Sequence, residues 1–270
     1  MTKPLSPAIK RRPVFKLSRK VFSYPYILVL LLFVIVPTAM LLVNAFIYDG
    51  EASGENFLLF FQNTVYMDIL ANSLLVGLLS TVICLVIGYP VAYLLSKFKH
   101  GQMLMMIFAI PMWINFLIKT RSLASIFEWL GMDLGAVSVI IGMVYIFLPM
   151  MIMPIHTTIS NIDKSYVEAA KDLGADGITV LFKVILPLSV PGIISGITMV
   201  FIPTISSFAI TTYLGGGEVE LFGDVIYNAY NHDLYGVGSV MSLIMLAFVL
   251  IASFAVNRFG GDDEKGGSLL

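Results

Sequence analysis

Long uncharged apolar runs constrain this chain more than any other feature. Each is close to the roughly 20 residues that an α-helix needs to cross a bilayer. With 58% of residues hydrophobic and only 12% charged, the chain holds more apolar surface than a soluble core absorbs, since soluble domains are about a quarter charged. We therefore expect an all-α membrane protein of six transmembrane helices. The expected spans are 27–46, 69–95, 103–118, 137–155, 188–210 and 237–256.

The runs divide the chain into three parts. We expect a basic N-terminal segment at 1–26, a six-helix transmembrane domain at 27–256 and a short tail at 257–270. The first run is longer than the roughly 7–15 residues of a signal-peptide core and has no clean cleavage site, which predicts a retained anchor.

Proline and glycine positions inside the runs carry further expectations. Pro111, Pro149 and Pro203 should bend their helices because proline removes a backbone donor, and the bends either shape a pathway or are ordinary packing kinks. The interruption at Gly88 and Pro90 is expected within the second run. Gly192 and Gly196 form a small-xxx-small pattern that favours close helix contact.

The distribution of Lys and Arg predicts the orientation of the spans. With a cytoplasmic N-terminus, every Lys and Arg except Lys119 and Arg121 lies on the inside, and most acidic residues lie outside. Cytoplasmic loops carry the excess of basic residues in membrane proteins. Both termini are therefore predicted to be cytoplasmic.

The sequence lacks the residues that several classes of function require. The formal net charge of −1 gives no basic field for nucleic acid. No Gly-x-x-x-x-Gly-Lys-Ser/Thr motif is present, so ATP hydrolysis by this chain is not expected. The three histidines lie on separate segments without ligand spacing, and Cys84 is the single cysteine. We expect no catalytic residue, no metal site and no bound cofactor.

The loop at 156–187 is the longest segment on the predicted inner side. Ser165 and Glu168 fit a capping box, which predicts that a short helix begins there and runs to Leu173. Gly174 suits the left-handed position that ends a helix. Such a helix can dock into a groove of another protein, or it can lie on the lipid headgroups.

This loop resembles the coupling loop of ATP-binding-cassette (ABC) importer permeases. The matching residues are Glu168, Ala169, Ala170, Gly174, Leu186 and Pro187, whereas Val184 stands where the family pattern usually has Ile. The resemblance implies a type I importer permease fold whose coupling helix inserts into a cleft of an ATPase subunit. It implies as partners an ATPase dimer that holds ATP and Mg²⁺, a second homologous permease chain and an extracytoplasmic substrate-binding protein. The implied location is the bacterial cytoplasmic membrane.

The wider resemblance is to the B-type permease subunit of spermidine/putrescine importers. It rests on residues 87–93, where Ile87 replaces Leu, on 111–115 and on 140–149. Related branches move iron, sulfate, phosphate or opines and share the loop. A polycation favours carboxylates and aromatic faces, whereas Lys119 and Arg121 would repel it and suit an anion. The residues predicted to line a substrate pathway are Trp113, Asn115, Glu128, Tyr213, Tyr227 and Asp224.

Two other functions remain to be weighed. An ion-coupled secondary carrier often places Asp, Glu or His at mid-membrane, and the runs contain none there. A membrane scaffold without transport activity is compatible with the docking loop alone.

Overall fold

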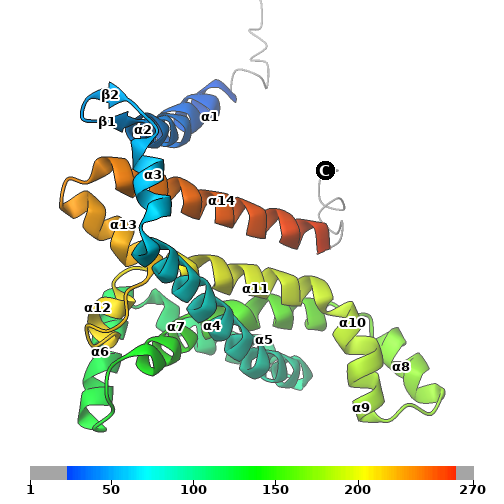
Figure 1. Ribbon diagram of the computed structural model, residues 1–270. Helices are drawn as coiled ribbons and strands as arrows, with labels where there is room; N and C mark the ends of the chain where they lie inside the picture. The colour runs from blue at the N-terminus through cyan, green and yellow to red at the C-terminus, as the bar shows by residue number, and fades with distance from the viewer. Residues whose placement is uncertain (1–22, 260–270) are drawn as a thin grey trace, which may run out of the picture.

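The computed structural model describes the backbone of residues 23–259 and the side chains of residues 25–254. Most of the predicted segment 1–26 and the end of the tail 257–270 lie outside the described residues. Apart from one small hairpin, the regular elements described are helical (Figure 1). The first half comprises α1 (Ser23–Leu30), η2 (Leu31–Ile35), α2 (Val36–Ala45), β1 (Ile47–Tyr48), β2 (Glu51–Ala52), α3 (Glu55–Gln62), α4 (Thr64–Lys97), α5 (Gly101–Ala109), η3 (Ile110–Trp113) and α6 (Phe116–Trp129). The second half comprises α7 (Ala136–Ser160), α8 (Lys164–Asp172), α9 (Gly177–Val180), η4 (Leu181–Ile185), α10 (Leu186–Leu188), α11 (Val190–Ile205), α12 (Ile210–Leu214), α13 (Phe222–Asn231) and α14 (Tyr235–Phe259).

The helices give the expected six spans only when two bent pairs are counted. Four stretches are long and apolar enough to cross a membrane unbroken: Pro25–Ala45, Thr64–Lys97, Ala136–Ser160 and Tyr235–Phe254. The other two candidates bend by 90° between Gly101–Trp113 and Phe116–Trp129, and by 65° between Gly177–Leu188 and Val190–Ile205. The fold is therefore a helical membrane bundle of four to six spans.

Three predictions about the spans were wrong in detail. The run 103–118 is not one helix, because the chain turns at Ile114 and Asn115, and the Asn115 side chain accepts the Leu117 amide to begin α6 at 2.9 Å. The run 188–210 ends as a helix at Ile205. The second run, by contrast, continues as α4 through Gly88 and Pro90 without interruption.

Two prolines follow wide helical turns. The π-helical turns η2 and η4 end at Ile35 and Ile185, two residues before Pro37 and Pro187. A proline offers no amide to the carbonyl four residues earlier and its ring crowds that carbonyl. Widening the preceding turn relieves this conflict, as in other π-bulges. Pro90, Pro149, Pro154 and Pro203 lie inside α-helices without such a turn, so the following proline favours a wide turn but does not by itself determine one.

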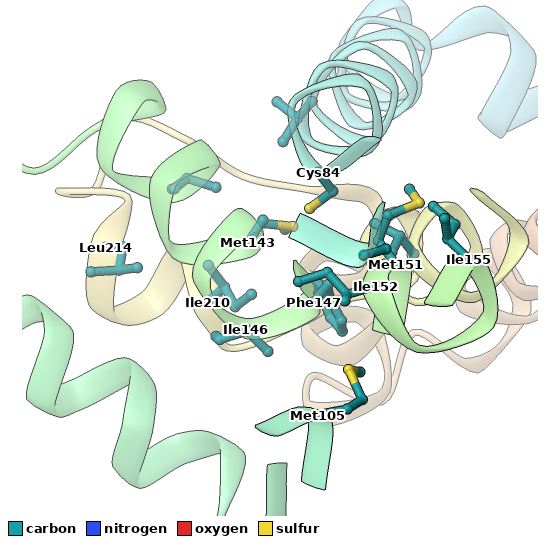
Figure 2. Close-up of a cluster of buried hydrophobic side chains, with 14 of the residues drawn as sticks. Cys84, Met105, Met143, Ile146, Phe147, Met151, Ile152, Ile155, Ile210 and Leu214 are labelled. Carbon is teal, nitrogen blue, oxygen red and sulfur yellow. The ribbon is translucent and has the colours of Figure 1, made fainter. Parts of the chain in front are cut away.

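The main core lies where α4, α7 and α11 pack together, with α5 and α12 at its margins (Figure 2). The predicted close contact of α11 is confirmed, since a Cβ added at Gly192 would lie 2.5 Å from Thr158 Oγ1 on α7. At Gly196 it would lie 3.1 Å from the Met151 carbonyl. Glycine at both positions lets the helix backbones approach closely. The core side chains labelled in Figure 2 are Cys84, Met105, Met143, Ile146, Phe147, Met151, Ile152, Ile155, Ile210 and Leu214.

A second, smaller core joins α2, α3, α13 and α14 around Phe60 and Phe222, whose rings meet edge-on at 6.2 Å between centroids. Asn56 on α3 donates to the carbonyls of Ala45 and Ile47, at 3.2 and 2.8 Å, and so fixes the β1–β2 hairpin after α2. The hairpin, α3, α12 and α13 were not expected from the sequence.

The bundle has two structurally distinct ends (Figure 1). One, the α8 end, carries α8, α9 and α10. The other, the α13 end, carries α12, α13 and the hairpin. The candidate functional residues divide between these two ends.

Candidate functional site

The helix α8 begins at an aspartate, which the sequence analysis overlooked. Asp163 is the N-cap and accepts the Ser165 amide at 2.9 Å, so the predicted capping box from Ser165 was wrong. Asp163 supplies the acceptor that the first free amides of a helix need. The Ser165 amide, followed by its hydroxyl, holds the pKa of the Asp163 carboxyl below its ordinary value.

The end of α8 agrees with the prediction. Gly174 has φ +83°, and the Gly174 amide donates to the Lys171 carbonyl at 2.8 Å. This left-handed conformation costs other residues more than glycine. The next helix, α9, begins after Asp176, whose side chain caps it by accepting the Thr179 amide at 3.0 Å. The Thr179 hydroxyl, and then its amide, lower the pKa of the Asp176 carboxyl.

The two faces of α8 differ in contact. Val167 and Ala170 are half-buried and pack against the main core. Tyr166, Ala169 and Leu173 recur at the i, i+3 and i+7 spacing of one helical face and are exposed, Leu173 at 90%. The helix has no buried residue. An exposed apolar face of this kind is compatible with contact to another protein or to the lipid headgroups.

A cavity of about 520 Å³ separates part of α8 from the bundle. Its walls come from the end of α4, the end of α7 and α8 itself. The charged side chains that line it are Lys97, Lys99, Lys164, Lys171 and Glu168. Glu168 therefore faces several lysines.

Leu186 and Pro187 form the elbow between α9 and span five. Leu186 is half-buried and its amide donates to the Leu181 carbonyl, closing η4, whereas Pro187 is exposed. Ser189, fully buried, donates to the Leu186 carbonyl at 2.9 Å and pairs with the Tyr89 hydroxyl of α4 at 3.0 Å. The elbow is thus tied to the core helix α4.

At the opposite end lies a pocket of about 480 Å³, here called the α13 pocket. It brings together Tyr213, Asp224 and Tyr227, three of the predicted pathway residues. Phe208, which the sequence analysis did not single out, stacks on Tyr227 with 5.2 Å between ring centroids and 15° between ring planes. The full lining is Leu117, Phe208, Ala209, Thr211, Thr212, Tyr213, Gly217, Val219, Glu220, Asp224, Tyr227 and Asn228.

Asp224 is held in place by its own chain. It is 8% exposed, and its carboxylate accepts the amides of Ala209 and Leu221, both at 3.0 Å, and the Thr211 hydroxyl. Ala209 has φ +70°, a left-handed conformation that is unusual for a residue with a Cβ. The carboxylate therefore stabilises the irregular segment between α11 and α12.

The remaining predicted pathway residues lie apart from this pocket. Trp113 is 91% exposed beside the turn at which Asn115 caps α6. Glu128 lies 3.9 Å from Arg121 in an exposed ion pair. Lys119 lines a separate, mostly apolar cavity of about 280 Å³ with Ile114 and Tyr145.

Within residues 23–259 no group of His, Cys, Asp and Glu could hold a metal ion. The residues missed by the sequence analysis, Asp163 and Phe208, carry different signals. Asp163 directly precedes the helix and could have been found as an N-cap. Phe208 meets Tyr227 only through tertiary folding, so nothing local marks it.

The chain is a polytopic helical bundle that carries an exposed apolar stub, α8, at one end. The chain belongs to the family of binding-protein-dependent transport system inner membrane components, whose family model matches residues 84–261. The match begins within α4 and includes α8, α12 and α13, but not the hairpin.

Among curated proteins the chain is similar to the spermidine/putrescine transport system permease protein PotB. The Haemophilus influenzae protein is 32% identical over 259 residues, covering 85% of this chain and 90% of the relative. The Escherichia coli protein is 31% identical over 258 residues, covering 85% and 94%.

Solved ABC transporters share the fold. A chain of a bacterial ABC transporter that imports the acidic polysaccharide alginate superposes with a TM-score of 0.72 and 16% identity, covering 90% of this chain and 96% of that one. A chain of the MetNI methionine ABC transporter, in an inward-facing conformation, gives a TM-score of 0.60 with 19% identity, covering 71% and 93%.

Proposed function

We propose that this protein is the transmembrane permease subunit of an ATP-driven importer of polyamines such as spermidine and putrescine. It forms part of the translocation pathway and receives movement from a separate ATPase. The observation that carries this proposal is α8, which is capped at both ends and presents Tyr166, Ala169 and Leu173 outward. A rigid helix with exposed apolar side chains suits docking into a groove of another protein.

The proposed assembly contains two ATPase subunits, a second homologous permease and a substrate-binding protein. ATP and Mg²⁺ are held by the ATPase subunits, and this chain binds no cofactor. The α8 end then faces the cytoplasm and the α13 end faces the substrate-binding protein. This orientation places both termini inside, in agreement with the distribution of Lys and Arg. The chain is similar to a chain of an alginate ABC transporter that was solved in complex with an alginate-bound periplasmic protein. This similarity supports a substrate-binding protein as a partner.

The proposed mechanism is alternating access. ATP binding closes the ATPase dimer and moves α8 and the corresponding helix of the second permease toward each other. This movement opens the α13 end to a loaded receptor. Hydrolysis resets the pathway toward the cytoplasm. In this chain the movement passes from α8 through η4 to the elbow at Leu186 and Pro187, and from there to α11 and, through Tyr89, to α4. Rigid-body rocking of this kind is general among transporters.

Polyamines are proposed as the solute because the relatives transport spermidine and putrescine and the match spans most of both chains. The test is to purify the co-assembled complex, reconstitute it in vesicles and measure uptake of labelled spermidine, putrescine, sulfate and ferric iron. ATP-dependent uptake of polyamines alone is expected. Import of an anion or iron would move the protein to another branch of the importers.

The same vesicles separate the proposal from its rivals. Uptake that survives ATP depletion but is abolished by an uncoupler would identify an ion-coupled carrier. Vesicles in which no loaded receptor stimulates ATP hydrolysis or uptake would favour a scaffold.

A further inference from the structure

The α13 pocket is lined by acidic and aromatic groups without a basic side chain. Glu220 and Asp224 are its two carboxylates, and no Lys, Arg or His lines it. Lys119, which would repel a cation, lines the separate cavity beside Ile114. The volume of the α13 pocket, about 480 Å³, lies within the roughly 300–1,000 Å³ of small-molecule sites. The pocket therefore favours a positively charged ligand.

The aromatic pair in this pocket is open to a ligand. Phe208 and Tyr227 are stacked on each other, yet 50% and 52% of their surfaces remain exposed. A cation within about 6 Å of a ring centroid is attracted by the negative face of the ring. The Tyr213 ring also lines the pocket and remains half-buried.

The two carboxylates have different roles. Asp224 is occupied by the Ala209 and Leu221 amides and the Thr211 hydroxyl. Glu220 is exposed, and among the described residues no hydrogen bond or ion pair engages its side chain. Glu220 is therefore the carboxylate that is available to a ligand.

We propose that the α13 pocket binds one primary ammonium group of a linear polyamine, between the Phe208–Tyr227 pair and the Glu220 carboxylate. This inference rests on the proposed function and assigns a subsite within it. Asp224 is a positioning residue, because it fixes Ala209, the residue after Phe208, in a left-handed conformation. Gly223 assists by close approach, since a Cβ there would lie 2.5 Å from the Ser207 carbonyl oxygen.

The experiment uses vesicles that contain the complete importer, saturated with polyamine-loaded receptor. The measured quantity is the number of spermidine or putrescine molecules imported per ATP hydrolysed. Tyr227→Leu and Phe208→Leu are each expected to lower this ratio by roughly 2- to 30-fold, the range that a lost cation–π contact supplies. Glu220→Gln is expected to lower it as well, and to weaken its dependence on ionic strength.

Matched variants separate ligand binding from structure. Tyr227→Phe keeps the ring and should retain most of the import ratio. Trp129→Leu removes an aromatic ring that is 84% exposed outside the pocket, and Glu218→Gln removes a neighbouring exposed carboxylate. Both should behave as the wild type does.

Several results would overturn the subsite. An unchanged ratio in Tyr227→Leu and Glu220→Gln would exclude ammonium binding there. A higher receptor concentration for half-maximal ATP hydrolysis, measured in a separate receptor titration, together with an unchanged import ratio would make the pocket a receptor contact instead. Wild-type vesicles that import no polyamine would overturn the proposed function and the subsite together, whereas the first two results overturn the subsite alone.

Discussion

The two ends of the bundle carry their candidate residues in opposite ways. At the α8 end the important side chains are exposed on a short helix with no buried residue. At the α13 end four residues of α13 are buried, and Asp224 is held by three hydrogen bonds. A surface made for a protein partner can be displayed by a locally stable helix. A pocket for a small molecule needs a framework that holds its walls, so substitutions at the two ends should fail differently.

The largest expected effect is at the α8 end. Leu173→Asp should weaken binding of the ATPase subunit by roughly 30-fold or more, because a charge replaces a side chain expected to be an interface hot spot. The fold should be unaffected, since Leu173 is 90% exposed. Co-purification of the ATPase checks this, with Leu234→Asp, an exposed leucine of the opposite end, as the control. Equal ATPase recovery from both variants would remove α8 from the coupling role.

The next effect is at the α13 end and should appear as lost stability. Asp224→Ala leaves the Leu221 amide and the Thr211 hydroxyl without their acceptor in a buried site, which costs about 1–3 kcal/mol. The thermal midpoint of the purified protein should fall by several degrees, at about 2–4 °C per kcal/mol. Asp133→Ala, at an exposed aspartate in the connection between α6 and α7, should leave the midpoint unchanged. If the two variants had the same thermal midpoint, the pocket walls would not depend on Asp224.

A smaller effect is expected where α8 ends. Gly174→Val should weaken ATPase binding by about tenfold, because a left-handed conformation costs a residue with a Cβ about 1–2 kcal/mol. The effect would come from the backbone alone, since no atom lies within 4 Å of a Cβ added there. Gly174→Asn tolerates this conformation better and should recover most of the binding. A valine variant that binds as well as the asparagine variant would contradict the conformational role.

The smallest effect concerns the cap of α8. Asp163→Ala should lower hydrogen-exchange protection of the α8 amides a few-fold, whereas Asp163→Asn should keep most of it. In the wild type the carboxyl pKa is lowered by folding, so the cap stabilises the helix fully above the unfolded pKa of about 3.9 and is lost as the pH falls through the folded value. Protection in the Asn variant should not change over that range. A wild type that shows no such acid-sensitive loss would argue against capping by Asp163.

The sequence predicts the α8 end better than the α13 end, for a physical reason. Gly174 acts within one short segment, so local rules identify it as the residue that ends α8. Which apolar side chains of α8 face outward required the structure, since Val167 and Ala170 pack against the main core. Another exception is the cap of α8: Asp163 and Ser165 are both N-cap residue types close together in the sequence, and the structure shows that Asp163 is the cap. The span positions also follow from local hydrophobicity, apart from the break at Asn115, where a polar cap overrides an apolar run, and the early end of α11 at Ile205.

The α13 pocket could not be assembled from the sequence in the same way. Leu117, Phe208 and Tyr227 come from three separate segments and meet only in the folded chain. Asp224 looked like a free carboxylate because its acceptor role depends on Ala209 and Thr211. The sequence named Tyr213, Tyr227 and Asp224 as pathway residues from their type alone, and their distribution between ligand contact and support required the structure.

The wide turn before Pro187 affects how force would enter the membrane. Pro187 contributes no amide, and the Leu186 amide reaches back five residues to Leu181. Fewer backbone hydrogen bonds therefore resist bending here than along α8, which contains no proline. Displacement of α8 is expected to reach span five mainly as a change in the 65° angle between Gly177–Leu188 and Val190–Ile205.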